Sequence, residues 1–308
     1  MKTYNYDLII VGGGPIAAST AYFLDNSNKK IALIKPEPQD SDENHISTYL
    51  YAGGSIRSYF DDEEIKQATS ETMDFIKNLK SQNVDLSLIE DFYCFLNKGI
   101  VVPSVNVSGF KLVNYFLNEA KNKGIEIFEK TYLEEIIETE DKIILKTNNG
   151  EFSAPKVLLA IGHSINKILK EREFNFIKRQ LFVLDLKLSE EQKRFPHLIL
   201  PFKDGVIYVF VKIVDGEYRF VLGQEDIIEE DDKFEATNYF DELKNMGAFE
   251  NLKFLKNAGV LKILWGFDAE NKKLKVYNKN NKIYAACCGS AVRSSVYIGK
   301  KLNNILNS

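Results

Sequence analysis

A glycine cluster near the start of the chain is the group of residues best suited to bind a ligand. Residues 12–14 are all glycine, and they separate an apolar run of strand length from a helix-forming run. Without a Cβ the backbone can approach a phosphate closely, and the amides that open the helix carry a partial positive charge. This spacing predicts a pyrophosphate-binding turn of a dinucleotide site. The residues that we expect to form it are Val11, Gly12, Gly14, Pro15, Ile16 and Ala17.

The strand after this turn ends in a lysine rather than an acid. Residues 31–34 are apolar and form the second strand of a β-α-β unit, with Lys35 at its end. Dinucleotide-binding folds usually place Asp or Glu there to bind the ribose hydroxyls. A lysine can donate to a hydroxyl, so we count Lys35 as a cofactor-binding residue. Two alternatives stay open: Lys35 binds a 2′-phosphorylated nicotinamide nucleotide, or Glu37 binds the ribose.

Composition excludes several classes of protein. The chain has 308 residues, enough for two domains, with 44% hydrophobic and 27% charged residues and a formal net charge of -4. We therefore expect no nucleic-acid partner and, because no apolar run could span a bilayer, no membrane span. The first strand follows Met1 too closely for a signal peptide, so we expect a cytoplasmic protein. The 3 cysteines and 3 histidines show no metal-ligand spacing, so no metal is expected.

The order of predicted elements indicates an α/β protein with a second, β-rich part. Amphipathic helices are expected at 63–82 and 109–123, and a hairpin at 91–102. Strands at 126–129, 134–138 and 142–147 are expected to form a meander that leads into a buried parallel strand at 156–160. Strand-like runs dominate 181–264, with one helix at 234–244. A last strand at 283–286 and a helix to residue 306 return to the first part.

Five segments in this order resemble the D-amino-acid oxidase-like FAD enzymes, which include glycine and sarcosine oxidases. They are the glycine cluster, the loop 51–59 ending in Ile-Arg-Ser-Tyr, the strand 157–162 ending in Ala-Ile-Gly, the Pro and Asp-Gly turn of 200–205, and 283–295 with its Gly-rich turn. The resemblance implies a FAD-binding Rossmann-like domain of glutathione-reductase type with a smaller β-rich substrate domain. The FAD-binding domain would comprise 1–82, 103–172 and 266–308, and the substrate domain 83–102 and 173–265.

The resemblance also implies a cofactor and its contacts. FAD would bind without a covalent link, because Tyr51 stands where related histidine-linked enzymes have their histidine; His45 is read as a polar loop residue. A helix N-terminus at the 289–292 turn would stabilise negative charge on the flavin. Beyond the first turn, the implied cofactor-binding residues are Gly53, Gly54, Ser55, Ile56, Ala160, Gly162, Gly289, Ser290, Ala291 and Val292.

Two arginines are the catalytic residues that the resemblance implies. Arg57 and Arg293 stand where sarcosine oxidases carry cations that hold the substrate carboxylate, and a guanidinium grips a carboxylate with two hydrogen bonds. The implied function is oxidation of a small amino acid or N-substituted amino acid by hydride transfer to flavin N5. An amine bound in its neutral form would need no protein base. Each arginine also has an alternative: Arg57 ties its loop to Asp61, or Arg293 is a surface charge.

Alternative functions remain open at this point. The short chain and Lys35 fit a FAD-binding subunit or module without amine oxidation, and the fold also serves tRNA-modifying flavin oxidases. Sarcosine-oxidase-like members keep a lysine over the flavin on a substrate-domain strand, where this chain has Val221, with Arg219 two residues earlier. The expected enzyme is therefore a dehydrogenase that passes electrons to a quinone or a protein partner.

Overall fold

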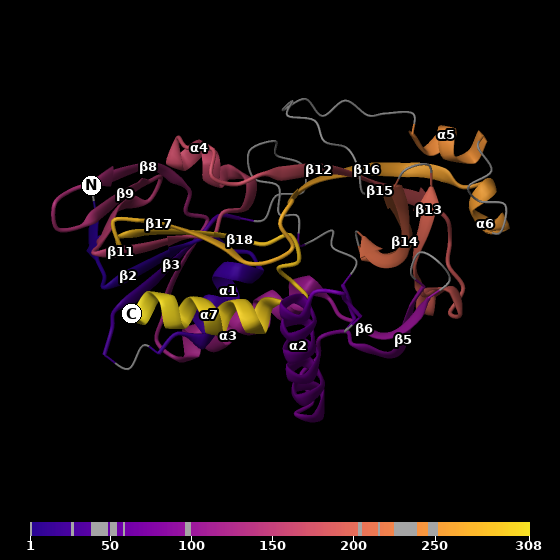
Figure 1. The fold of residues 1–308 in the computed structure, drawn as a ribbon, viewed down its shortest axis with the longest axis horizontal. Coiled ribbons are helices and arrows are strands. Elements are labelled where there is room, and N and C mark those ends of the chain that lie inside the picture. The colour runs from indigo at the N-terminus through magenta and orange to yellow at the C-terminus, as the bar shows by residue number, and fades with distance from the viewer. Residues whose placement is uncertain are drawn as a thin grey trace.

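The computed structural model describes most of the chain. The described residues are 2–25, 28–37, 49, 54–57, 59–95, 100–202, 205–214, 216–224, 239–245 and 252–308. Three sheets organise them, and both ends of the chain lie at the same end of the molecule (Figure 1).

A six-stranded sheet forms the centre of the first part. Its order is β17-β18-β11-β2-β3-β7, and all neighbours are parallel except the pair β17 and β18. The central strands are apolar and buried except for a partly exposed lysine at the end of β3 and at the start of β11, as a parallel sheet covered on both faces requires. The strands are β2 (Leu8–Val11), β3 (Ile31–Lys35), β7 (Glu126–Glu129), β11 (Lys156–Leu159), β17 (Lys275–Lys279) and β18 (Ile283–Cys287).

Three helices cover one face of this sheet (Figure 1). They are α1 (Pro15–Phe23), α3 (Gly109–Asn122) and α7 (Ser295–Asn307). Helix α1 packs against both of the others. A Cβ on Gly299 of α7 would lie 2.6 Å from the carbonyl oxygen of Ser19, so the glycine allows this close packing.

A small second sheet and the short helix α4 (Ile165–Leu169) cover the opposite face. The second sheet is β1-β10-β9-β8, formed by β1 (Thr3–Asn5), β8 (Leu133–Glu138), β9 (Ile143–Thr147) and β10 (Gly150–Ala154). The predicted meander was therefore wrong in one strand. β7 pairs with β3 in the parallel sheet, because α3 returns the chain to that edge, and β10 is the third strand of the meander.

The third sheet has eight strands in the order β16-β12-β15-β14-β13-β5-β6-β4. They are β4 (Ser55–Arg57), β5 (Ile89–Phe95), β6 (Val101–Asn106), β12 (Phe176–Asp185), β13 (His197–Phe202), β14 (Gly205–Val214), β15 (Glu217–Gln224) and β16 (Gly259–Ala269). The short helices α5 (Tyr239–Asn245) and α6 (Lys253–Lys256) lie at its far end, and α2 (Glu63–Ser81) packs against α7 near the middle of the molecule (Figure 1).

The fold class predicted from the sequence, a Rossmann-like α/β part with a β-rich part, is confirmed. The residue boundaries of the two domains remain a proposal. The eight-stranded sheet also takes in β4, the last four residues of β6 and the end of β16, which the proposed division assigns to the FAD-binding domain. Within the described residues, no helix is both long and apolar enough to cross a membrane.

Candidate functional site

One large cavity lies where the parallel sheet meets the eight-stranded sheet. Its volume is about 720 Å³, and it opens at the carboxyl ends of β2 and β11, where ligands bind in open α/β sheets. Five stretches of chain contribute most of its wall: 11–16, 54–57, 160–164, 266–269 and 287–293. The eight-stranded sheet also contributes Phe176, Arg179, Leu181, His197, Tyr208 and Phe210 to the wall.

The glycine turn opens directly into this cavity. Gly12 has φ +137°, and a Cβ on it would lie 2.3 Å from the carbonyl oxygen of Ala160, so only glycine fits. Gly14 caps α1, and a Cβ there would meet nothing closer than Cδ1 of Tyr49 at 3.8 Å. The space beside Gly14 is thus left open by the protein itself. An open cradle at the positive end of a helix fits a pyrophosphate.

Most of the predicted site residues line the same cavity. Two do not: Ala17 is fully buried beneath the turn, and Lys35 points its ammonium at Glu129, with Nζ 3.3 Å from Oε1. Glu37 forms an ion pair with Lys130. Gly53, Tyr51 and His45 lie outside the described residues. The residues brought together are Val11, Gly12, Gly14, Pro15, Ile16, Gly54, Ser55, Ile56, Arg57, Ala160, Gly162, Gly289, Ser290, Ala291, Val292 and Arg293.

The two predicted catalytic arginines meet at one aromatic ring. Arg57 comes from β4 and Arg293 from the turn before α7, and their guanidinium carbons lie 5.1 and 5.5 Å from the ring centroid of Phe60. Both arginines and Phe60 line the cavity. Two half-buried cations held against one aromatic ring are an arrangement that can attract an anion.

His197 was missed in the sequence analysis. Its ring faces Tyr208 and Phe210, with centroids 5.9 and 5.2 Å away, and neither ring nitrogen has a hydrogen-bond partner among the described side chains. Burial, with Arg57 and Arg293 nearby, lowers the pKa of His197 to about 3. The imidazole is therefore neutral at ordinary pH, and it adds no charge beside the two arginines.

The second missed group is an ion pair, Arg179 of β12 with Asp268 of β16. Arg179 Nε lies 3.4 Å from Asp268 Oδ2, and both side chains line the cavity. Burial raises the pKa of Asp268 to about 6, although Arg179, Arg293 and Lys272 oppose this rise. The sequence held a signal for Asp268, which interrupts a largely apolar strand, but not for Arg179, which stands between Lys178 and Gln180. Only the pairing of the two strands showed that they meet.

Comparison with known proteins now identifies the family. The family model for FAD dependent oxidoreductases matches residues 94–248, half of the chain. The chain belongs to the FAD-dependent oxidoreductase family. A comparison with curated protein sequences finds no match.

Solved structures share the fold of this FAD-dependent oxidoreductase over nearly its whole length. L-proline dehydrogenase from P. horikoshii has a TM-score of 0.79 at 16% identity, covering 99% of this chain and 94% of its own. Glycine oxidase from Geobacillus kaustophilus has a TM-score of 0.72 at 14% identity, covering 99% and 95%. L-alpha-glycerophosphate oxidase from Mycoplasma pneumoniae, solved with FAD bound, has a TM-score of 0.66 at 15% identity, covering 100% and 96%. At these identities the likeness shows the fold.

Two turns that line the cavity of this flavoprotein have the features that FAD binding requires. The turn of residues 12–14 supplies the pyrophosphate cradle, and the 289–292 turn faces the same cavity before α7. A Cβ on Gly289 would lie 2.1 Å from the carbonyl oxygen of Ala269, so the strand β16 and this turn approach as closely as glycine allows.

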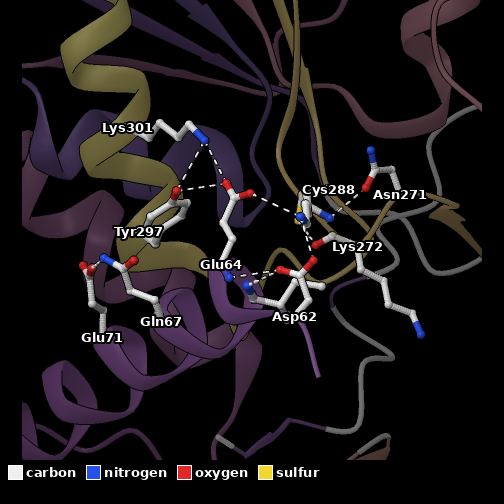
Figure 2. Close-up of polar contacts among 11 residues, drawn as sticks. Asp62, Glu64, Gln67, Glu71, Asn271, Lys272, Cys288, Tyr297 and Lys301 are labelled. Carbon is white, nitrogen blue, oxygen red and sulfur yellow. Dashed lines mark hydrogen bonds and ion pairs between the residues drawn. The ribbon is translucent and has the colours of Figure 1, made fainter. Parts of the chain in front are cut away.

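A polar network holds this second turn in place (Figure 2). The amide of Gly289 donates to the carbonyl of Asn271 at 2.9 Å, and the Cys288 thiol donates to the carbonyl of Lys272 at 3.1 Å. Lys273 then pairs with Asp62 at 2.6 Å, at the start of α2. Burial raises the pKa of both Cys287 and Cys288 to about 12, so these thiols stay protonated at neutral pH.

Proposed function

We propose that this chain oxidises a small amino acid or N-substituted amino acid with FAD bound non-covalently. The observation that carries the proposal is the meeting of Arg57 and Arg293 at Phe60, inside the cavity that the FAD contacts line. Arginine matches a carboxylate with two parallel hydrogen bonds, so two arginines from separate elements fix both the position and the orientation of the acid.

The surrounding side chains suit oxidation of a bound amine. Leu181, Tyr208 and Phe210 provide an apolar wall beside the arginines, and His197 stays neutral. An apolar wall limits water and strengthens the electrostatic attraction between the arginines and a carboxylate. FAD, when bound, supplies the hydride acceptor for this chemistry. The chain's own part is to hold the acid, exclude water and present the carbon–nitrogen bond.

The test is a spectrum followed by reduction. Purified protein should be yellow, and anaerobic addition of amino acids and N-methyl amino acids, one at a time, should bleach the flavin with at least one of them. A yellow protein that no amino acid bleaches would favour the FAD-binding subunit over the enzyme. A tRNA-modifying oxidase would likewise ignore the amino-acid panel.

A separate test shows whether FAD is bound non-covalently. Acid precipitation of the holoprotein should release the yellow FAD into the supernatant, because Tyr51 occupies the position of the attachment histidine in related histidine-linked enzymes. A pellet that keeps the colour would show a covalent flavin. The control is precipitation of apoprotein to which FAD has been added, which calibrates recovery.

A further inference from the structure

Asp268 places a negative charge beside the two-arginine site, a feature that the proposed carboxylate binding does not use. It lies on β16, two residues after Gly266 and directly before the end of that strand, and 28% of its side-chain surface remains exposed. Among the described cavity-lining residues, the only other acid is Glu134, which belongs to β8.

The two oxygens of Asp268 have different surroundings. Oδ2 faces Arg179 across 3.4 Å, whereas Oδ1 lies 3.3 Å from the position that a Cβ on Gly289 would take. Oδ1 is thus directed to the turn that leads to Arg293. Among the described residues Arg179 is the one ion-pair partner of Asp268, and a carboxylate has lone pairs for several donors. Oδ1 retains capacity for a cation that enters the cavity.

Charges of both signs therefore line one part of the cavity. Arg57 and Arg293 attract an acid, and Asp268 with Oδ1 turned toward the Arg293 side attracts a cation. An amino acid at neutral pH carries both charges on neighbouring atoms. Resting on the proposed function, we infer that the site binds its substrate as a zwitterion, with Asp268 holding the positively charged nitrogen while the arginines hold the carboxylate. This nitrogen must lose its proton before hydride transfer, and the carboxylate of Asp268 beside it is the group placed to accept that proton.

A pair of isosteric ligands tests this inference without turnover. Glycine betaine carries a carboxylate and a fixed positive charge, and 3,3-dimethylbutanoate has the same shape with carbon in place of the charged nitrogen. Binding to the FAD-loaded protein is measured by calorimetry and by the change in the flavin spectrum. The wild type should bind betaine more tightly than 3,3-dimethylbutanoate by at least about thirty-fold, the effect of a buried charge pair of roughly 2 kcal/mol.

Asp268→Asn should abolish this preference. The variant keeps the shape and loses the charge, so affinity for betaine should fall by about thirty-fold while affinity for 3,3-dimethylbutanoate is unchanged or higher. Asp185→Asn is the matched control, since Asp185 pairs with Arg219 outside the cavity lining and its side chain is 66% exposed. That control should keep the wild-type preference.

The wild type alone provides a second measurement if Asp268→Asn does not fold. Burial raises the pKa of Asp268, and the groups that act on it are Arg179, Arg293 and Lys272, with Cys287 and Cys288 on the adjacent strand and turn. Because Asp268 becomes neutral below its pKa of about 6, the preference for betaine should shrink between about pH 7.5 and pH 5.5. The affinity of 3,3-dimethylbutanoate, corrected for its own ionisation, should not fall.

The outcomes separate the two proposals. Equal binding of both ligands at every pH would overturn the role of Asp268 and leave the carboxylate site intact. Failure of the wild type to bind either ligand, together with an amino-acid panel that never bleaches the flavin, would overturn the proposed function itself.

Discussion

At the scale of single residues, the glycines of the first turn have different physical reasons to be glycine. Gly12 must be glycine for the fold itself, because its φ is positive and a side chain would collide with the carbonyl of Ala160. At Gly14 the protein leaves room for a side chain. Gly12→Ala should therefore destabilise even the apoprotein, by about 1–3 kcal/mol. Gly14→Val should keep the fold, because its φ of -87° is ordinary, yet abolish FAD binding by filling the phosphate space.

Thermal unfolding of the two apoproteins and flavin titration separate these effects. Gly216→Ala is a suitable control for Gly12→Ala, since Gly216 also has a positive φ, of +82°, but meets nothing within 4 Å of an added Cβ. If Gly14→Val bound FAD as tightly as the wild type, the pyrophosphate would have to lie elsewhere.

Arg57 carries a second prediction at this scale. Removing one partner from a buried charge pair costs roughly 2–5 kcal/mol, so Arg57→Ala should weaken a carboxylate ligand by about thirty-fold or more and leave FAD in place. Arg219→Ala is the matched control, because Arg219 forms ion pairs with Asp185 and Glu217 and does not line the cavity. Titration with acetate or 3,3-dimethylbutanoate gives the affinities. Unchanged affinity in Arg57→Ala would assign that arginine to its loop.

At the scale of elements, polar contacts join α2 to α7, the helix that follows the 289–292 turn. Glu64 of α2 accepts hydrogen bonds from Lys301 and Tyr297 of α7, both at 2.9 Å (Figure 2). The hydrogen bond from Lys301, then that from Tyr297, lowers the pKa of Glu64 below its ordinary 4.5. A carboxylate with a depressed pKa stabilises the fold above its unfolded-state pKa, and this stabilisation is lost as pH falls through the folded-state value.

Glu64→Gln should therefore lower the melting temperature at neutral pH by no more than a few degrees. Glu64 is partly exposed, with 32% of its side-chain surface accessible, and such a pair contributes about 1 kcal/mol or less. The difference between wild type and variant should shrink as the pH falls below about 4.5. Scanning calorimetry across pH measures it, with Glu63→Gln, an 82% exposed neighbour, as the control. A difference that grew in acid would contradict this assignment.

Elements with local signals could be predicted from the sequence, and elements defined by distant pairing could not. The helix over 63–82 was found within one residue, because its apolar residues recur at helical spacing, and the structure shows that Asp62 caps it. β7 was assigned to the wrong sheet, since it pairs with β3 from a distant part of the sequence. The same reason hid the pair of Arg179 with Asp268 and the approach of His197 to the arginines. Arg57 and Arg293 were proposed as site residues through the family resemblance, not through a local pattern.

At the scale of the whole molecule, two sheets meet so that each contributes one wall of the cavity. The parallel sheet presents the turns at 12–14 and 289–292, and the eight-stranded sheet presents the side chains that would face a substrate. The choice of electron acceptor belongs to this scale, because it depends on which charges the second wall turns toward the flavin. A fixed cation there stabilises developing superoxide and so promotes reaction with oxygen.

We propose that β15 is the strand on which related oxidases carry this cation, and that this chain has Val221 in its place. Val221 is 1% exposed and packs in an apolar cluster with Val183 and Phe210, and Arg219 is held by Asp185 and Glu217. Neither lines the cavity. The arginines that line the cavity have other partners in the proposed complex. Arg57 and Arg293 bind the substrate carboxylate, and Arg179 pairs with Asp268. We therefore expect slow reaction with oxygen, and a dehydrogenase that passes electrons to a quinone or a protein partner.

Stopped-flow mixing of the reduced protein with oxygenated buffer measures this property directly. Reoxidation by oxygen should be much slower than reoxidation by an artificial quinone under the same conditions. Val221→Lys should accelerate the oxygen reaction if β15 faces the flavin, and Ile213→Lys, at an exposed position on β14, controls for added charge. Wild-type reoxidation as fast as turnover with substrate would show an oxidase. Lys272, which lines the cavity, would then be the first cation to replace, since its loss should slow the oxygen reaction alone.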